Sequence, residues 1–479
     1  MTILHRKDLN SEHKIKADIC IIGGGVVGLS TALSLAKKNP QSTIALLESG
    51  LDKPGHGQNA ADGELIGDAF ETLSNNRIRA LGGTQWVWGG HSRPLDPIDF
   101  EKRDWIEYSG WPISYEEFAQ YIKPATQILD IDDYDWSDIH PEVNYQDISK
   151  SEIFENCHFK LSPQIAKKSK NNKGVYSFSR NKELAEQANL NIYLDHTVLH
   201  LNFNSDKSKV KSAVTSGLDG QTGLITAGKF ILSAGGIENS RLMKYWFGRE
   251  DAPDLACYDN VGRYFMGHPH RDVAKVLVSE NQVPKLRHQF GVRHGTAVHM
   301  IRFKPTDQAL RKYRLNSQTI VLRRKQPDRY GATMYKAVSI CEQIPDPKNR
   351  IELGDEKDMY GIPKVKMYWS YNQQDMDSMN FVANEFPKFT GMNSIGRSKP
   401  VVFPLGTKMG SGHHHMGGTR MGENAKEAVV DSNCKLFDVD NFYVAGGSVF
   451  PTSGGVNPTI NMLALSQRLV DHLTSQGDL

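Results

Sequence analysis

A glycine-rich turn between two apolar runs is the feature that most constrains the fold. Ala17–Ile22 is a short apolar run typical of a buried strand, and Val26–Leu35 has apolar residues at helical spacing. Between them, Gly23, Gly25 and Gly28 have the spacing GxGxxG. Such glycines permit a tight turn, close approach of the backbone to a pyrophosphate, and close packing of helix on strand. We therefore expect a βαβ unit that binds a dinucleotide at the helix N-terminus.

An acidic residue follows the second strand of this unit. Ser42–Leu47 has the pattern of another buried strand, and Glu48 comes directly after it, about 20 residues beyond Gly28. This is the offset expected for a carboxylate that binds the ribose. A carboxylate at a strand end can also be simply solvated, and the motif does not distinguish NAD from FAD.

Composition excludes several classes of function. The chain has 479 residues with 57 Lys and Arg against 55 Asp and Glu, so it lacks the basic excess of a nucleic-acid-binding protein. No apolar run approaches the ~18 residues of a membrane span. The five cysteines form no CxxC pair, which argues against a disulfide framework, a thiolate zinc site and a dithiol redox centre. Residues 1–16 are polar, without the apolar centre of a secretory signal, so we expect a cytoplasmic protein.

Apolar runs that end at glycines recur far along the chain. Gly228–Gly236 and Asn441–Gly447 both have this pattern, and Pro458–Leu473 is helical in its spacing. The recurrence predicts one α/β domain, a Rossmann-like fold assembled from separated segments. The expected segments of this first domain are 14–100, 190–262 and 406–479, and those of a second domain are 101–189 and 263–405.

The carboxyl-terminal region contains two motifs suited to chemistry. His415 is followed by Gly417 and Gly418, so backbone can pack closely beside an imidazole. Asn457 and Pro458 have the residue types of an N-cap and a first helical position, which is a good helix start in any protein. Glycines 454 and 455 precede this start and favour a docking site there, where a helix N-terminus would stabilise negative charge.

The run His413–His415 has two interpretations. A zinc site would need carboxylates or thiolates at suitable spacing, and none stands out. A neutral imidazole that acts as a base fits better, because histidine has the side-chain pKa nearest neutrality.

Together these segments resemble the glucose–methanol–choline (GMC) oxidoreductases, FAD enzymes that oxidise alcohols. The form of Leu81–Pro94 and of Ser109–Ser114 is similar to that of pyranose oxidases and sugar dehydrogenases. The other matching segments are the glycine motif with Glu48, Ile231–Arg241, Asn260–Pro269, Arg350–Leu353, Gly361–Trp369, HxxGT at His415–Thr419 and GGVNPT at Gly454–Thr459.

The resemblance implies an FAD-binding Rossmann-like domain and an α+β substrate domain built on an antiparallel sheet. It also implies that His415 takes the proton of the substrate hydroxyl, that Asn457 hydrogen-bonds the same oxygen, and that a hydride goes to flavin N5. His414 is the alternative base. The residues expected at the cofactor are Gly23, Gly25, Gly28, Glu48, Gly82, Gly83, Val198, Ala234, Gly447, Ser448, Pro458 and Thr459.

We expect FAD to be bound noncovalently. Pyranose oxidases carry FAD on a histidine of the glycine-rich segment, and the matching position here is Val87. His91 lies four residues further on and would need a shifted alignment. Glu238 and His268 lie in matching segments, and structural hydrogen bonding is the simpler expectation for both.

The expected substrate is a sugar, a cyclitol or a similar polyol, with a hydrophobic alcohol or sterol as the alternative. Trp369, Tyr368 and Tyr371 could stack on a ring, although strand packing explains them equally. The electron acceptor is external, oxygen or another molecule, because the chain has no CxxCH haem motif. A disulfide reductase is excluded by the absence of CxxC, and an inert FAD-fold binding protein is disfavoured by the presence of both His415 and Asn457.

Overall fold

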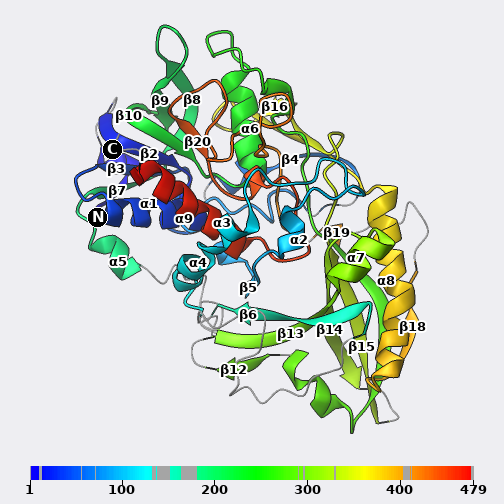
Figure 1. Cartoon of the computed structure of the whole chain (residues 1–479). Helices are drawn as coiled ribbons and strands as arrows, with labels where there is room; N and C mark the ends of the chain where they lie inside the picture. Colours follow the sequence, from blue (N-terminus) through cyan, green and yellow to red (C-terminus); the bar gives the residue numbers. More distant parts are fainter. Residues whose placement is uncertain are drawn as a thin grey trace.

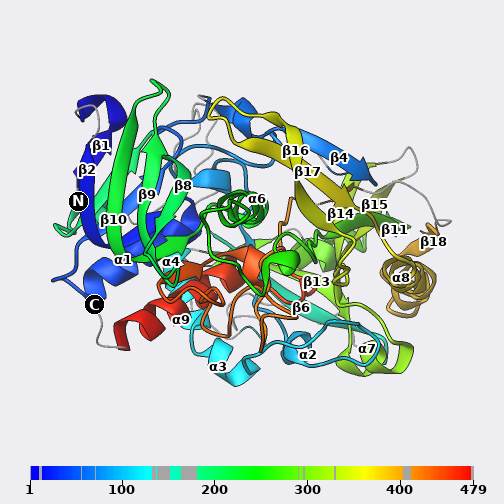
Figure 2. The same cartoon turned by 90° about the horizontal axis from the view of Figure 1, so that it is seen from above.

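In the computed structural model, three β-sheets organise the described part of the chain. Two large sheets lie in separate halves of the molecule, and a small third sheet lies beside helix α6 (Gly236–Phe247) (Figures 1 and 2). The structure describes residues 2–9, 13–55, 57–68, 70, 72–131, 136, 151–162, 181–289, 291–294, 297–327, 331–402, 410–411 and 413–475.

The first sheet has eight strands in the order β1-β7-β3-β2-β10-β9-β8, with β20 beside β10. Pairing is parallel from β1 through β10 and to β20, and antiparallel from β10 to β8. Its strands are β1 (Thr2–His5), β2 (Lys14–Ile22), β3 (Ile44–Glu48), β7 (Leu190–Leu194), β8 (Thr197–Phe203), β9 (Val210–Ser216), β10 (Thr222–Leu232) and β20 (Phe442–Val444).

The expected βαβ unit is confirmed at the centre of this sheet. Strand β2 pairs in parallel with β3, and α1 (Val26–Lys38) connects them. Every residue of β3 is buried, as expected for a parallel strand that is covered on both faces. Helix α9 (Thr459–Ser475) packs against α1, so the last helix of the chain covers the first (Figure 1).

The second sheet has nine strands and is antiparallel throughout. Its order is β18-β11-β15-β14-β13-β6-β5, with β12 beside β13 and β19 beside β11. Helix α8 (Gln373–Met392) covers one face, where Phe386 and Phe389 pack against Phe303. The strands are β5 (His91–Ser92), β6 (Phe154–Leu161), β11 (Pro269–Ser279), β12 (Val292–His294), β13 (Ala297–Pro305), β14 (Gln318–Pro327), β15 (Ala332–Cys341), β18 (Arg397–Pro400) and β19 (Gly410–Ser411).

The third sheet joins segments that the sequence assigned to different domains. Strand β4 (Gly63–Gly67) pairs in parallel with β17 (Pro363–Trp369), which pairs antiparallel with β16 (Arg350–Lys357). In addition, β5 and β19 belong to the nine-stranded sheet although their residues fall in segments expected for the first domain. Strand β1 belongs to the eight-stranded sheet although its residues precede the expected first segment, which begins at residue 14. The expected domain boundaries stay a proposal, and apart from these strands they follow the two large sheets.

The remaining helices are short and lie between successive strands of the chain. Trp369 of β17 is buried and donates a hydrogen bond to Gln343, so packing within the protein accounts for it. The short helices are α2 (Pro97–Phe100), α3 (Tyr115–Ala119), α4 (Ile122–Ile128), α5 (Asn181–Ala185) and α7 (Asp307–Tyr313).

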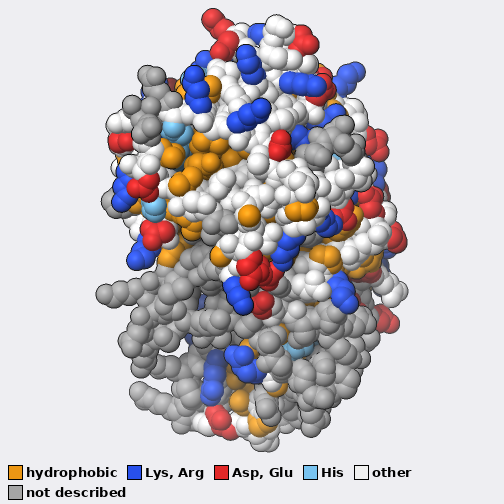
Figure 3. Space-filling model, turned by 90° about the vertical axis from the view of Figure 1, so that its left-hand side faces the viewer, with side chains coloured by type: hydrophobic (Ala, Val, Ile, Leu, Met, Phe, Trp, Pro, Cys, Tyr) orange, Lys and Arg blue, Asp and Glu red, His pale blue; other side chains and the backbone are white. Residues whose placement is uncertain are grey.

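Membrane-spanning helices and metal-binding clusters are both absent from the part of the chain that the structure describes. No helix is long and apolar enough to cross a membrane, and no group of three His, Cys, Asp or Glu could hold a metal ion. The face shown in Figure 3 intersperses basic with acidic side chains among the residues that are coloured.

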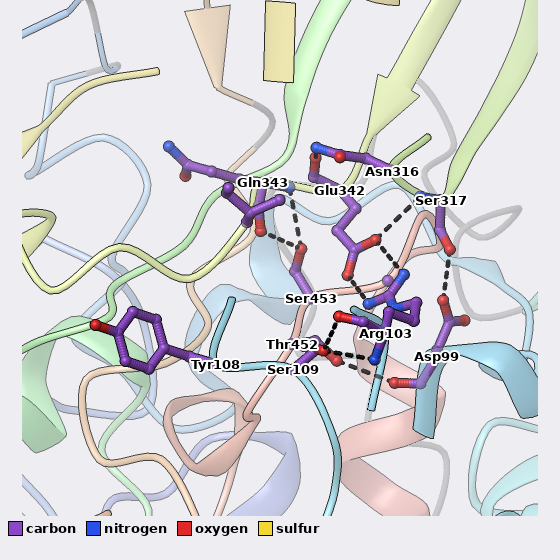
Figure 4. A network of polar contacts seen from close by, with 12 residues as sticks. Asp99, Arg103, Tyr108, Ser109, Asn316, Ser317, Glu342, Gln343, Thr452 and Ser453 are labelled. Atoms are coloured by element: carbon purple, nitrogen blue, oxygen red, sulfur yellow. Dashed lines mark hydrogen bonds and ion pairs between the residues drawn. The ribbon is translucent and has the colours of Figure 1, made fainter. Parts of the chain in front are cut away.

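A buried polar network ties the connection after α2 to the ends of β14 and β15 (Figure 4). Arg103 donates to both carboxylate oxygens of Glu342, at 2.8 and 2.7 Å, and both side chains are completely buried. Ser317 donates to Asp99 at 2.6 Å, and Thr452 donates to the main-chain oxygen of Asp99 at 3.1 Å. Breaking one partner of such a buried pair typically costs about 3–5 kcal/mol, so the network holds these segments in a fixed relation.

Asp99 makes this network sensitive to pH. Burial, together with the nearby Glu342, raises the pKa of Asp99 to about 7, from about 3.9 in an unfolded chain. The native state therefore binds more protons between these values, and the stabilising contribution of Asp99 is lost as the pH rises through that window.

We expect Asp99→Asn to stabilise the protein relative to wild type at about pH 8 but not at about pH 5, because the amide mimics the protonated carboxyl group. Urea denaturation of both proteins at the two pH values measures the difference. A difference in unfolding free energy that is the same at both pH values would contradict the raised pKa.

Candidate active site

A cavity of about 510 Å³ lies at the carboxyl ends of the parallel strands. Its walls include the residues that directly follow β2, β3, β10 and β20, where a doubly wound sheet binds its ligands. The volume is within the range of about 300–1,000 Å³ that small-molecule sites occupy. Much of the wall is main chain, contributed by the segments Gly23–Gly25, Ala234–Gly236 and Ala445–Gly447.

The glycines of this wall fit a dinucleotide. A Cβ atom added to Gly25, Gly235 or Gly446 would meet no atom within 4 Å, so these three positions face open space. A Cβ atom on Gly28 would lie 2.0 Å from the main-chain oxygen of Gly23, so that glycine serves the packing of α1 on β2. The wall is therefore a backbone cradle of the kind that a pyrophosphate approaches closely.

Glu48 lies in the cavity wall at the end of β3. Its carboxylate accepts hydrogen bonds from the main-chain N–H groups of Gly24 at 2.8 Å and Gly50 at 2.7 Å. Burial raises the pKa of Glu48, and these two N–H groups act against that increase. Arg79 and Thr197, joined by a hydrogen bond of 3.2 Å, line the same end of the cavity. This polar end suits a ribose, as the sequence predicts.

Most of the expected cofactor residues line the cavity. Gly28 and Gly82 do not line it, and Gly82 donates its N–H to the main-chain oxygen of Gly24. Ser448 does not line the cavity either: it is fully buried and accepts a hydrogen bond from Asn239 at 2.9 Å, so the expected pyrophosphate contact needs correction. The expected residues that line the cavity are Gly23, Gly25, Glu48, Gly83, Val198, Ala234, His415, Gly447, Asn457, Pro458 and Thr459.

The expected pairing of His415 with Asn457 is corrected by the structure. The amide Nδ2 of Asn457 lies 3.1 Å from Nε2 of His414. The ring of His415 instead lies near the rings of Phe70 and Phe265, at 5.8 and 6.2 Å between centroids. Its Nε2 is buried and has no hydrogen-bond partner among the described residues.

Backbone geometry explains why His414 rather than His415 meets Asn457. Met416 forms an antiparallel bridge with Met266, with hydrogen bonds of 3.0 and 2.7 Å in the two directions. Side chains of successive residues in extended chain point to opposite sides. Two neighbouring histidines beside this bridge therefore face different surroundings.

Both histidines are neutral over the physiological pH range. Burial lowers the pKa of His415 to about 3. Burial also holds the pKa of His414 well below its ordinary value, and the neighbouring His268 and His270 lower it further. A neutral imidazole has a free lone pair, so either ring can accept a proton.

Several residues of the cavity carry no sequence signal that would have identified them. Arg77 and Arg241 both form ion pairs with Glu238, at 2.9 and 2.6 Å, and all three line the cavity. Burial alone would raise the pKa of Glu238, but the two arginines hold it below the ordinary value. Glu238 thus has the structural hydrogen-bonding role that we expected.

We expect a substitution in this backbone cradle, Gly25→Val, to weaken cofactor binding without unfolding the protein. The added side chain of Gly25→Val would occupy open cavity space, and the backbone at Gly25 has an extended conformation that valine adopts readily. Overfilling a site costs about 1–3 kcal/mol, so we expect flavin affinity to fall about tenfold to 100-fold. Absorbance of bound flavin and circular dichroism report the two properties separately.

Gly391→Ala is the control, because a Cβ atom there also meets open space but lies in α8, none of whose residues lines the cavity. Its flavin content should equal that of wild type. Full flavin content in Gly25→Val would show that this cradle does not hold the cofactor.

Comparisons with known proteins agree with this geometry. Residues 345–466 match the GMC oxidoreductase family model for the carboxyl-terminal domain, and residues 18–136 match the model of FAD dependent oxidoreductases. The large subunit of fructose dehydrogenase from Gluconobacter japonicus is 23% identical over 82% of this chain and 80% of its own. The 2-methyl-1,2-propanediol dehydrogenase of Mycolicibacterium austroafricanum is 23% identical over 86% and 83%.

Solved structures show the same fold. A formate oxidase of Aspergillus oryzae superposes with a TM-score of 0.61 at 14% identity, covering 98% of this chain and 99% of that one. The cradle and the two family matches agree on the cofactor, FAD. The chain therefore contains a GMC oxidoreductase segment, residues 345–466, and is an FAD-dependent oxidoreductase similar to members of that family.

Proposed function

We propose that this enzyme oxidises an alcohol group of a sugar, cyclitol or similar polyol to a carbonyl, with His414 as the base. The observation that carries the proposal is the pair of His414 and Asn457 in the wall of the cavity, with 3.1 Å between Nε2 and Nδ2. The names of the relatives, a fructose dehydrogenase and a propanediol dehydrogenase, support a hydroxyl-bearing substrate.

His414 and Asn457 divide the work on the substrate oxygen. When substrate binds, its hydroxyl group replaces Nδ2 of Asn457 as the donor to Nε2 of His414, which takes the hydroxyl proton. Nδ2 of Asn457 then donates its hydrogen bond to the substrate oxygen that loses the proton. Bound FAD supplies the acceptor for the hydride from the neighbouring carbon. Positioning of this kind and a base in contact with the reacting proton are the contributions that the protein makes.

The cradle residues and the start of α9 would hold the cofactor. The turn Gly23–Gly25 and Gly447 offer main chain to the phosphates, and Glu48 offers its carboxylate to the ribose. Asn457 and Pro458 place the first turn of α9 in the cavity wall. The positive end of this 17-residue helix would stabilise negative charge on a flavin bound there.

Noncovalent attachment remains our prediction. Val87 and His91 both line the cavity, and Val87 is 55% exposed but has no nucleophilic atom. Burial lowers the pKa of His91 to about 3, which leaves a neutral ring at the cavity edge. We expect acid precipitation to release the yellow cofactor into the supernatant; flavin that stays in the pellet would indicate a covalent link, and His91→Ala would then test that side chain.

Anaerobic reduction of the flavin tests the proposed reaction. The purified protein is mixed with sugars, cyclitols, simple alcohols and a sterol, and the visible absorbance is followed. We expect sugars or polyols to bleach the flavin band. Bleaching by the sterol or by hydrophobic alcohols alone would replace the polyol with an apolar substrate, and a band that no alcohol bleaches would refute alcohol oxidation of these classes.

The same measurement on two neighbouring variants identifies the base. We expect His414→Asn to slow flavin reduction by at least ~10²-fold, because general-base catalysis contributes about 10²–10⁴-fold. We expect the change in His415→Asn to be much smaller, since that ring does not meet Asn457. Flavin absorbance before mixing controls for loss of cofactor, and the opposite ranking of the two variants would restore His415 as the base.

A further inference from the structure

The candidate base belongs to a chain of hydrogen bonds that begins at Arg302 and ends at the main chain of Gly454. Arg302 Nη1 lies 3.5 Å from Asn457 Oδ1, and Asn457 Nδ2 lies 3.1 Å from His414 Nε2. His414 Nδ1 lies 2.8 Å from His268 Nδ1. His268 Nε2 lies 2.7 Å from the oxygen of Gly454. The two histidine rings meet edge to face, with an interplanar angle of 89°.

The carbonyl groups at the Gly454 end of this hydrogen-bond chain determine the tautomer of His268. A carbonyl oxygen can only accept, and Nε2 of His268 lies near two of them, at 2.7 Å from Gly454 and 3.3 Å from Ser453. That nitrogen therefore carries hydrogen. Burial lowers the pKa of His268 to about 4, so the ring is neutral at physiological pH and its Nδ1 has a free lone pair.

The tautomer of His414 follows from that of His268. Because Nδ1 of His268 is an acceptor, Nδ1 of His414 must carry the hydrogen of their 2.8 Å contact. His414 is also neutral, since burial and the adjacent His268 hold its pKa well below the ordinary value. Its Nε2 is consequently the nitrogen without hydrogen, as a base in contact with substrate requires.

The contact of Arg302 with Asn457, at the other end of the hydrogen-bond chain, independently supports this tautomer of His414. A guanidinium can only donate, so the Asn457 atom that faces Arg302 is the carbonyl oxygen. The amide then directs Nδ2 toward His414, where only a nitrogen with a free lone pair can accept. Arg302 is 2% exposed and lies 3.8 Å above the ring of Phe159, which fixes the guanidinium in place.

We propose that His268 is a positioning residue that keeps the proton of His414 on Nδ1 and thereby keeps Nε2 free to act as the base. The proposal rests on the function proposed above for His414. His268 acts through His414, and its own position depends on the carbonyl groups that accept its Nε2–H.

The carbonyl groups that receive this hydrogen bond are held by the network in Figure 4. Ser453 exchanges hydrogen bonds with the main chain of Gln343, at 3.2 and 3.3 Å, and the side-chain oxygen of Gln343 accepts the N–H of Gly267 at 2.8 Å. The residues on both sides of this contact are therefore fixed, because Gly267 precedes His268 and Ser453 precedes Gly454.

Other titratable groups that face His414 act in the same direction. His270 lies beside its ring at 6.0 Å between centroids, and His413 and His415 flank it in sequence. Each of these, like His268, lowers the pKa of His414, and Arg302 adds positive charge behind Asn457. The neutral form of His414 and the direction of its hydrogen bonds should thus persist across the neutral pH range.

Two substitutions at His268 distinguish a hydrogen-bonding role of its side chain from a role in filling space. His268→Gln can accept from His414 through Oε1 and donate to Gly454 through Nε2, whereas His268→Leu fills space and can do neither. We expect anaerobic flavin reduction at saturating substrate to slow by at least about tenfold in the leucine variant, the scale typical of lost outer hydrogen-bond partners. The glutamine variant should recover most of that loss, and the leucine variant should show an altered pH profile of the reduction rate.

Nitrogen NMR of histidine-labelled holoenzyme tests the tautomer without measuring activity. His414, assigned by the resonance lost in His414→Asn, should show hydrogen on Nδ1 and none on Nε2 in wild type and in His268→Gln. His268→Leu should lose this single tautomer. Hydrogen on Nε2 of His414 in the wild-type protein overturns the proposal even if neither His268 variant folds.

The kinetic outcomes distinguish the two proposals. If His414→Asn slows flavin reduction but His268→Leu equals wild type, the positioning role is wrong and the function of His414 stands. If His414→Asn also equals wild type, the proposed base itself is wrong. Equal losses in His268→Leu and His268→Gln would assign His268 a packing role and would likewise overturn the positioning proposal.

Discussion

One segment of main chain, residues 445–459, connects the two large sheets and carries much of the site. It begins after β20 in the eight-stranded sheet and reaches α9, which covers α1. Between these points it crosses the end of the nine-stranded sheet, where Thr319 donates to the oxygen of Gly455 at 3.1 Å. A Cβ atom on Gly455 would lie 2.6 Å from the N atom of Gln318, so the approach to β14 depends on glycine. This one crossing places part of the cavity wall and the side-chain amide of Asn457.

The sequence predicts the parts of the site that depend on local geometry. The glycine motif and Glu48 lie where spacing places them, because a βαβ unit needs only neighbouring residues to form its turn. The pairing of β4 with β17 joins residues about 300 positions apart, and nothing in either strand indicates its partner. For the same reason the exact domain boundaries exceed what apolar patterns can provide.

The choice between His414 and His415 shows this limit at the scale of one residue. Three consecutive histidines have identical side chains. The direction in which each side chain points depends on the bridge between Met416 and Met266, which are far apart in sequence. Ser448 is a similar case, since its contact with Asn239 turns it away from the cavity that Gly447 lines. Motif spacing identifies the segment, and tertiary hydrogen bonds decide which of two neighbouring side chains meets the ligand.

The same segment also explains why the direction of the hydrogen-bond chain is stable. The main-chain oxygen of Gly454 accepts from His268 and the side-chain amide of Asn457 donates to His414, so the two contacts come from positions within four residues of each other. Thr452 and Ser453, directly before them, are bonded to Asp99 and Gln343 beside the buried pair of Arg103 and Glu342. A displacement of this segment would therefore move two groups together: the carbonyl oxygen that accepts from His268 and the amide that donates to His414. The buried ion pair thus stabilises the fold and, through the hydroxyl groups of Thr452 and Ser453, the orientation of the imidazole that we propose as the base.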